Sequence, residues 1–168
     1  MTDTKTILVT GGLGYIGSHT VVELFNTEYL KSNSIKNKFE VVILDDCSSC
    51  SDKILPILES MINHKIVFYK VSLNDKTALE ECFKKHKFDA VIHFAGKKSV
   101  NESIDKPLFY YENNFIGSFN LIEIYMEIEK INQMKMRNIY FLLILMENQS
   151  FSLNICLKIQ LKLTLILK

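Results

Sequence analysis

The sequence has little of several features that mark specialised classes of protein. Lysine and arginine (20 together) nearly balance aspartate and glutamate (19), and the net charge is +1. Without a dense basic face, nucleic acid is disfavoured as the main partner. The longest unbroken apolar run, residues 139–146, is too short to cross a bilayer. Internal repeats and low-complexity blocks are also absent, so 168 residues with 48% hydrophobic content indicate one globular domain.

Cysteine is scarce as well, with four residues, which fits a reducing compartment. Cys47 and Cys50 have the spacing of a redox or zinc motif, but no second pair or nearby histidine completes a metal site. We therefore expect two loop cysteines and no bound metal. Residues 1–5 contain no apolar signal region. The expectation is a cytoplasmic protein without a membrane partner.

Glycine is rare, yet four of the six glycines lie between residues 11 and 17. The segment 10–17 reads TGGLGYIG, follows the apolar run 7–9 and precedes a helix-like stretch. Strand, glycine turn and helix in this order are typical of dinucleotide binding. Glycines permit the tight turn, the approach of a pyrophosphate to the backbone, and close packing of helix on strand. The free N–H groups of the helix N-terminus then face the phosphates.

Strands and helices are expected to alternate along the chain. The apolar runs are continuous rather than alternating, which is typical of parallel strands buried on both faces. The predicted fold is therefore an α/β, doubly wound parallel (Rossmann) sheet, truncated after its fifth strand. The strands are expected at 5–9, 40–44, 66–71, 88–94 and 137–146, the helices at 15–30, 52–61, 74–85 (capped by Asn74) and 107–133, and a polar loop at 31–38.

Two strand ends carry residues suited to a dinucleotide. Asp45 directly follows the second apolar strand, where a carboxylate accepts hydrogen bonds from both ribose hydroxyls. Together with Asp46 it would repel a 2′-phosphate, so NAD is expected rather than NADP. At the end of the fourth strand, small residues would let a flat cofactor lie against the backbone. There we expect His93 to be a core-edge residue and Lys98 to meet the cofactor's charge.

Several segments together resemble the UDP-glucose 4-epimerases, a family of extended short-chain dehydrogenase/reductases. The resemblance covers residues 5–141 and rests on VTGGLGYIGSHT (9–20), ILDD (43–46), VIHFAG (91–96), SVNES (99–103), Lys106-Pro107 and YYENN (110–114) with Gly117. It implies bound NAD, a UDP-sugar substrate and, for the full-length family, a homodimer. It implies cofactor contacts from Gly11, Gly14, Tyr15, Ile16, Gly17, Asp45, Asp46, Ser49, Cys50, Ser72, Leu73, Phe94, Ala95, Gly96, Lys98 and Asn114.

The sequence departs from that family at two places. Ser72 stands where the family usually has an aspartate near the adenine. More importantly, the family needs Tyr-x-x-x-Lys, and none of the seven tyrosines has a lysine four positions later. We expect the family's sugar-nucleotide domain to be absent as well. We therefore expect no catalytic residues in this chain and no activity by itself.

The last part of the chain is unlike the family. No glycine or proline follows Gly117, and residues 157–168 mostly alternate apolar and polar. This pattern fits an amphipathic strand or translation out of frame, and we favour the second. The expected domains are a NAD-binding Rossmann domain at 1–141 and a divergent tail at 142–168. Two other functions stay open: a NAD(H)-binding module or pseudoenzyme, and another sugar-nucleotide enzyme such as a 4,6-dehydratase.

Overall fold

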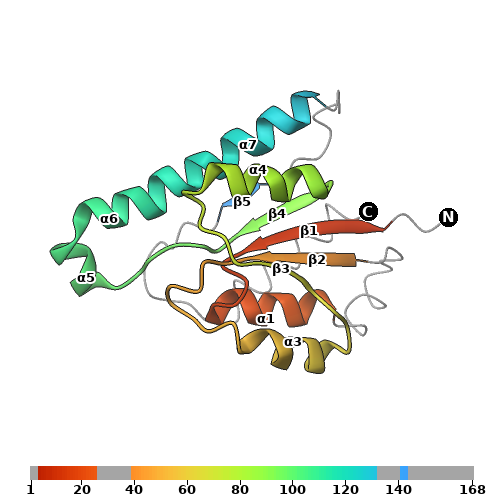
Figure 1. Ribbon diagram of the computed structural model, residues 1–168. Coiled ribbons are helices and arrows are strands. Elements are labelled where there is room, and N and C mark those ends of the chain that lie inside the picture. Colours follow the sequence, from red (N-terminus) through yellow and green to blue (C-terminus); the bar gives the residue numbers. More distant parts are fainter. Residues whose placement is uncertain (1–3, 26–38, 132–140, 144–168) are drawn as a thin grey trace.

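A computed structural model describes residues 4–25, 39–131 and 141–143 of the chain. Within these residues, five strands form one sheet in the order β3-β2-β1-β4-β5, with β1 at its centre (Figure 1). The bounds are Lys5–Thr10 for β1, Phe39–Leu44 for β2, Val67–Tyr69 for β3, Ala90–His93 for β4 and Phe141–Leu143 for β5.

Every strand pair in this sheet is parallel. Ile7 in β1 lies opposite Val41 in β2 and Ala90 in β4, and the register continues along both pairs. The prediction that the runs at 7–9, 41–44 and 91–94 are neighbouring parallel strands is thus confirmed. The sheet order places the carboxyl ends of β1, β2 and β4 beside one another, where open α/β sheets bind ligands.

Helices cover both faces of the sheet (Figure 1). Alternate residues of β1 point to opposite faces. Ile7 and Val9 belong to the core cluster that also contains residues of α1 and α3, and Leu8 belongs to the cluster with residues of α4 and α7. The helices are α1 (Tyr15–Leu24), α3 (Ile54–Ile62), α4 (Lys76–Lys85), α5 (Val100–Asp105), α6 (Pro107–Tyr111) and α7 (Gly117–Ile131). The predicted doubly wound parallel sheet is confirmed.

Two predicted helix starts differ from the structure. Helix α4 is capped by Asp75, whose carboxylate accepts a hydrogen bond of 3.1 Å from the N–H of Ala78, rather than by Asn74. A carboxylate here also meets the positive end of the helix dipole. Helix α3 begins at Ile54 rather than near Asp52, and Asp52 pairs instead with Lys70 at 3.1 Å.

The long helix predicted from Pro107 is interrupted. After α6, residues Glu112–Ile116 form one π-helical turn, η1, before α7 begins at Gly117. The short helix α5 precedes them and was not predicted. Ser99 caps α5 by accepting from the N–H of Glu102 at 3.4 Å. A π turn widens the helix by one residue and shifts the direction of the side chains it carries.

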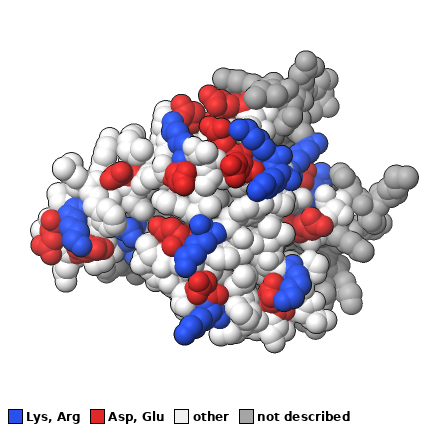
Figure 2. Space-filling model, in the orientation of Figure 1, with Lys and Arg blue, Asp and Glu red and all other residues white. Residues whose placement is uncertain are grey.

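Some predictions fall outside the described residues, namely the helical segment 26–30, the loop 31–38 and most of the tail. Strand β5 pairs Leu142 with Ile92 and Leu143 with His93, so it crosses the expected domain boundary after residue 141. The boundary itself stays a prediction. No helix among the described residues is long and apolar enough to cross a membrane. The face drawn in Figure 2 carries mixed acidic and basic side chains.

Candidate functional site

A cavity of about 230 Å³ opens at the carboxyl ends of β1, β2 and β4. It is bounded by the glycine turn, the start of α1 and the loops that follow β2 and β4. All of the predicted site residues line it except Ser72 and Asn114. The lining residues are Gly11, Gly14, Tyr15, Ile16, Gly17, Leu44, Asp45, Asp46, Ser48, Ser49, Cys50, Val71, Leu73, Phe94, Ala95, Gly96, Lys97, Lys98 and Asn113.

Two positions of the glycine turn admit no side chain. Gly11 has a φ of +66°, in the left-handed region, and a Cβ there would lie 2.6 Å from the backbone nitrogen of Ala95. A Cβ on Gly17 would collide with the carbonyl oxygen of Gly11. The Gly11 N–H also donates to the carbonyl of Leu44 at 2.8 Å. The turn therefore fixes the ends of β1, β2 and β4 against one another.

The N-terminus of α1 faces this cavity without a capping side chain. Its N-cap is Gly14, in an extended conformation, and no side chain accepts from the first helical N–H groups. Tyr15, Ile16 and Gly17 in the first turn line the cavity. Free N–H groups and the positive end of a helix dipole make such a terminus a binding site for anions. The cavity can thus hold a phosphate or pyrophosphate at this end.

Asp45 lies between the glycine turn and the loop after β2, and only 7% of it is exposed. Its Oδ2 accepts from the N–H of Leu13 at 3.1 Å, and its Oδ1 accepts from the N–H of Cys47 at 2.9 Å. An ionised carboxylate offers about four acceptor positions. Because the Cys50 thiol also donates to Oδ1, Asp45 ties two loops together and keeps about one acceptor position for a ligand's hydroxyl group.

The loop after β2 is held by further hydrogen bonds. Asp46 accepts from the backbone and the hydroxyl of Ser48 at 2.8 and 2.6 Å. The Cys50 thiol donates to Asp45 at 3.4 Å. Burial, and next the charge of Asp45, raise the pKa of Cys50 to about 12 and raise the pKa of Cys47 as well. Both groups are therefore neutral thiols near neutral pH.

The loop after β4 is fastened to η1 by Asn114. Its amide accepts from the N–H of Lys97 at 2.8 Å and donates to the carbonyl of Lys97 at 2.8 Å. Its neighbour Asn113 lines the cavity and donates to Asn114 at 2.9 Å. Asn114 thus holds the loop, and the preceding Asn113 lines the cavity. The predicted contact of Asn114 with a cofactor stays a prediction.

His93 is buried beneath the cavity floor, with 4% of it exposed. Its Nδ1 contacts the hydroxyl of Thr10 at 2.5 Å, and its Nε2 contacts the hydroxyl of Ser118 at 2.8 Å. Burial lowers its pKa to about 4. A neutral imidazole with both nitrogens occupied is a core-edge residue, as the sequence predicts.

Sequence reasoning missed five lining residues, and each had a partial signal. Leu44 and Val71 end strand-like runs beside predicted residues, and Ser48 lies in a loop already assigned to the cavity. Lys97 adjoins Lys98, and two neighbouring lysines gave no means of choosing between them. Asn113 was missed because only one of two neighbouring asparagines, Asn114, was assigned to the cofactor. Ser72 lies outside the lining, with its hydroxyl accepting from the N–H of Asn74 at 3.3 Å.

Two of the described tyrosines, Tyr69 and Tyr110, have pKa values shifted away from the range that a base would need. Burial raises the pKa of Tyr69, and burial followed by the Glu102 hydrogen bond raises the pKa of Tyr110. Tyr110 donates to Glu102 at 2.9 Å outside the cavity lining. A tyrosine acting as a base near neutral pH needs its pKa lowered instead. The geometry therefore suits holding a dinucleotide.

Comparison with known proteins agrees with this geometry. Residues 8–139 match the family model described as GDP-mannose 4,6 dehydratase. The chain is 44% identical over 123 residues to UDP-glucose 4-epimerase 1 of Oryza sativa subsp. japonica, covering 71% of this chain and 32% of that protein. It is 44% identical over 117 residues to UDP-glucose 4-epimerase of Bacillus subtilis, covering 70% and 32%. The chain thus spans about a third of the length of the curated relatives it matches.

Solved structures give the same likeness. The UDP-glucose 4-epimerase from Bifidobacterium longum, in complex with NAD⁺ and UDP, matches with a TM-score of 0.65 and 32% identity, over 73% of this chain and 34% of that one. The enzyme from Stenotrophomonas maltophila, with bound NAD and formylated UDP-arabinopyranose, matches with a TM-score of 0.62 and 32% identity, over the same shares.

Proposed function

Because this chain belongs to the family described as GDP-mannose 4,6 dehydratase, we propose that its cavity binds NAD and that these 168 residues form the dinucleotide-binding part of an enzyme of the UDP-glucose 4-epimerase type. The observation that carries the proposal is the uncapped N-terminus of α1, which follows the glycine turn and faces the same cavity as Asp45. The NAD bound in two similar epimerase structures supports it.

The cavity offers separate positions for the parts of NAD. The pyrophosphate would meet the backbone of Gly14, Tyr15 and Ile16 at the positive end of α1. The adenosine ribose would donate to the carboxylates of Asp45 and Asp46. Two carboxylates disfavour a 2′-phosphate by charge repulsion, and the described lining contains no arginine. NAD is therefore proposed in preference to NADP.

We propose that the chain by itself does not interconvert UDP-glucose and UDP-galactose. Bound NAD supplies a hydride acceptor, but a second group must take the proton of the sugar hydroxyl. These 168 residues contain no Tyr-x-x-x-Lys, and without a poised base general acid–base catalysis is lost, which contributes typically 10²–10⁴-fold. A UDP-sugar substrate is a proposal for a longer protein of which this chain would be a part.

A binding role without chemistry is the second candidate. The absence of Tyr-x-x-x-Lys favours it, because a NAD(H)-binding module or pseudoenzyme needs the cavity but no base. A 4,6-dehydratase is a further candidate, to which the description of the matching family gives support. Both candidates share the NAD site, so a binding experiment tests the common part first.

Calorimetry on the 168-residue chain with NAD and with NADP tests this proposal. We expect tighter binding of NAD, and a loss of that binding in Asp45→Ala, because hydrogen bonds to a charged group contribute about 1.5–3 kcal/mol each. Asp52→Ala is the matched control, since Asp52 pairs with Lys70 outside the cavity lining. Equal affinity for the two cofactors would overturn the assignment of Asp45, and turnover of UDP-galactose by the chain would overturn the inactivity.

A further inference from the structure

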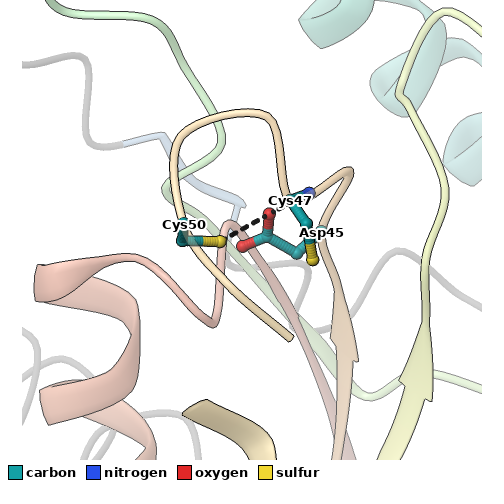
Figure 3. Close-up of side chains that lie close together, drawn as sticks. All are labelled: Asp45, Cys47 and Cys50. Atoms are coloured by element: carbon teal, nitrogen blue, oxygen red, sulfur yellow. Dashed lines mark hydrogen bonds between the residues drawn. The ribbon is translucent and has the colours of Figure 1, made fainter. Parts of the chain in front are cut away.

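Three groups of the types that bind zinc, two thiols and one carboxylate, gather in the loop after β2. The carboxylate of Asp45 and the thiols of Cys47 and Cys50 each offer one ligand atom, and these atoms all lie within 4.8 Å of one another. Figure 3 shows the sulfur of Cys50 pointing toward the Asp45 carboxylate, with Cys47 beside it. Sequence reasoning considered only cysteine and histidine as partners for the pair, and so it passed over Asp45.

The separation between the Cys50 sulfur and an oxygen of Asp45 matches a tetrahedral zinc site. With Zn–S near 2.3 Å and Zn–O near 2.0 Å, a tetrahedron places a sulfur and an oxygen about 3.5 Å apart. The Cys50 sulfur lies 3.4 Å from Oδ1 of Asp45. An ion would therefore enter with small movements of these two side chains, replacing the hydrogen bond that joins them now.

The backbone already holds these ligands in place. Cys47 has a φ of +57°, and its N–H donates to Asp45 at 2.9 Å, which bends the loop around the carboxylate. Asp45 is further fixed by the N–H of Leu13. A ligating carboxylate that also accepts backbone hydrogen bonds is a common arrangement around protein-bound metals. Cys50 borders the open cavity, which leaves room for water as a fourth ligand.

We propose that Asp45, Cys47 and Cys50 form a binding site for Zn²⁺. On binding, each thiol gives its proton to solvent, two Zn–S bonds and one Zn–O bond form, and water completes the tetrahedron. No oxidation or reduction is involved. Three protein ligands with one open position make a site that exchanges its ion more readily than a closed structural site of four ligands.

The site overlaps the cavity, because Asp45 and Cys50 both line it. Resting on the proposed NAD function, we infer that Zn²⁺ and NAD compete for this end of the cavity. Competition is reciprocal: the factor by which zinc weakens NAD binding equals the factor by which NAD weakens zinc binding. The chain would then bind NAD poorly whenever zinc occupies Asp45.

Titration of the reduced 168-residue chain with Cd²⁺ and Zn²⁺, without NAD, is the test. Cadmium bound by thiolates gives an ultraviolet charge-transfer absorption, and calorimetry in buffers of different ionisation enthalpy counts the released protons. We expect one ion and about two protons per chain, and a loss of affinity of roughly 100-fold or more in Cys47→Ser and in Cys50→Ser, since even outer-shell changes cost 10–100-fold. Cys156→Ser, a change outside the described residues, is the control and should bind as the parent does.

The outcomes separate this inference from the proposed function. Metal binding that survives in Cys47→Ser and Cys50→Ser, or no binding at all, overturns the zinc site and leaves NAD binding standing. Circular dichroism of each variant shows whether it is folded, and the Cys47→Asp variant, which keeps a ligand, should regain part of the affinity. If zinc binds with two protons released while NAD fails to bind in its absence, the NAD proposal is wrong and the metal site holds.

Discussion

His93 and Thr10 lie opposite each other on β4 and β1, and a hydrogen bond of 2.5 Å joins Nδ1 to the Thr10 hydroxyl. Ser118 donates its own proton to the carbonyl of Asn114, so it must accept from Nε2 of His93. We therefore assign the neutral tautomer with the proton on Nε2. Thr10 then donates to Nδ1, and a second proton on the ring would put a charge in this buried position and force the Thr10 hydroxyl to accept instead.

This arrangement predicts a loss of stability in mild acid. The pKa of His93 is about 4 in the folded chain against about 6.5 when unfolded. Above pH 6.5 both states are neutral; between pH 6.5 and 4 only the unfolded state takes up the proton, so the free energy of unfolding falls as the pH falls. The loss should approach about 3 kcal/mol at pH 4.

Urea unfolding at several pH values measures this loss. His93→Asn keeps an acceptor near Thr10 and removes the titrating group. Its stability should be lower at pH 7, because Ser118 loses a partner, but it should change less than that of the parent between pH 6.5 and 4. An unchanged pH slope in the variant would assign the acid sensitivity to other groups.

Substitutions at two glycines of the turn should have different effects on stability and on NAD binding. Gly17→Ala should lower the free energy of unfolding by several kcal/mol, because its Cβ would meet the backbone of Gly11 and Gly12. Gly14→Ala is the matched change, since its Cβ would lie 3.3 Å from one carbonyl oxygen and its φ of −71° suits alanine. The Gly14→Ala variant should fold, with its free energy of unfolding lowered by about 1 kcal/mol. It should still bind NAD more weakly, because the added methyl group lies at the N-terminus of α1. Thermal melts measure the stability of both variants, and calorimetry measures their affinity for NAD. Equal melting temperatures would contradict the collision expected at Gly17.

Asn114 should influence NAD binding without lining the cavity. Asn114→Ala removes both hydrogen bonds to Lys97 and should cost about 1–3 kcal/mol in stability, since the Lys97 backbone groups lose their partner. The loop after β4 would loosen, so NAD affinity should fall as well. Asn101→Ala, at an exposed position of α5, is the control and should change neither quantity. Hydrogen exchange at residues 95–98 reports the loosening directly, and unaltered exchange there would count against it.

The two neighbouring lysines should have different roles. Lys97 spans the cavity and donates to the Ser48 hydroxyl at 2.9 Å, whereas Lys98 is exposed at the lining. Lys98→Met should weaken NAD about ten-fold by losing one charge-assisted contact, and should lessen the salt dependence of binding. Lys97→Met should instead speed hydrogen exchange in the loop of residues 47–50. If Lys97→Met weakened NAD binding and Lys98→Met sped hydrogen exchange in the loop, the roles of the two lysines would be the reverse of those proposed.

The sheet was predictable because strands buried on both faces have continuous apolar sequences. Continuous apolar runs such as the one at 41–44 are typical of parallel strands buried on both faces. The carboxyl ends of those strands then define the site, which is why Asp45 and the residues from Phe94 to Gly96 were found. Helix α5 escaped notice although Ser99 and Glu102 have the spacing of a capping box.

Other features depend on tertiary contacts that one sequence does not reveal. The π turn at Glu112–Ile116 has the same apolar pattern as a regular helix, so this interruption of the long helix could not be foreseen. The position of Asp45 between Cys47 and Cys50 depends on the left-handed bend at Cys47, a residue with no special preference for it. The packing of the surrounding residues determines these backbone conformations.

The central place of β1 in the sheet has a consequence for synthesis of the chain. Among the described strands β1 leaves the ribosome before the others, and it pairs with residues 39–44 on one side and with residues 90–93 on the other. Until β4 has emerged, one edge of β1 has no partner, and Gly11 lacks the backbone of Ala95 against which it packs. Native pairing therefore waits for distant segments, which slows folding and prolongs exposure of apolar strand edges. A nascent chain shorter than about ninety residues is expected to need a chaperone rather than a cofactor.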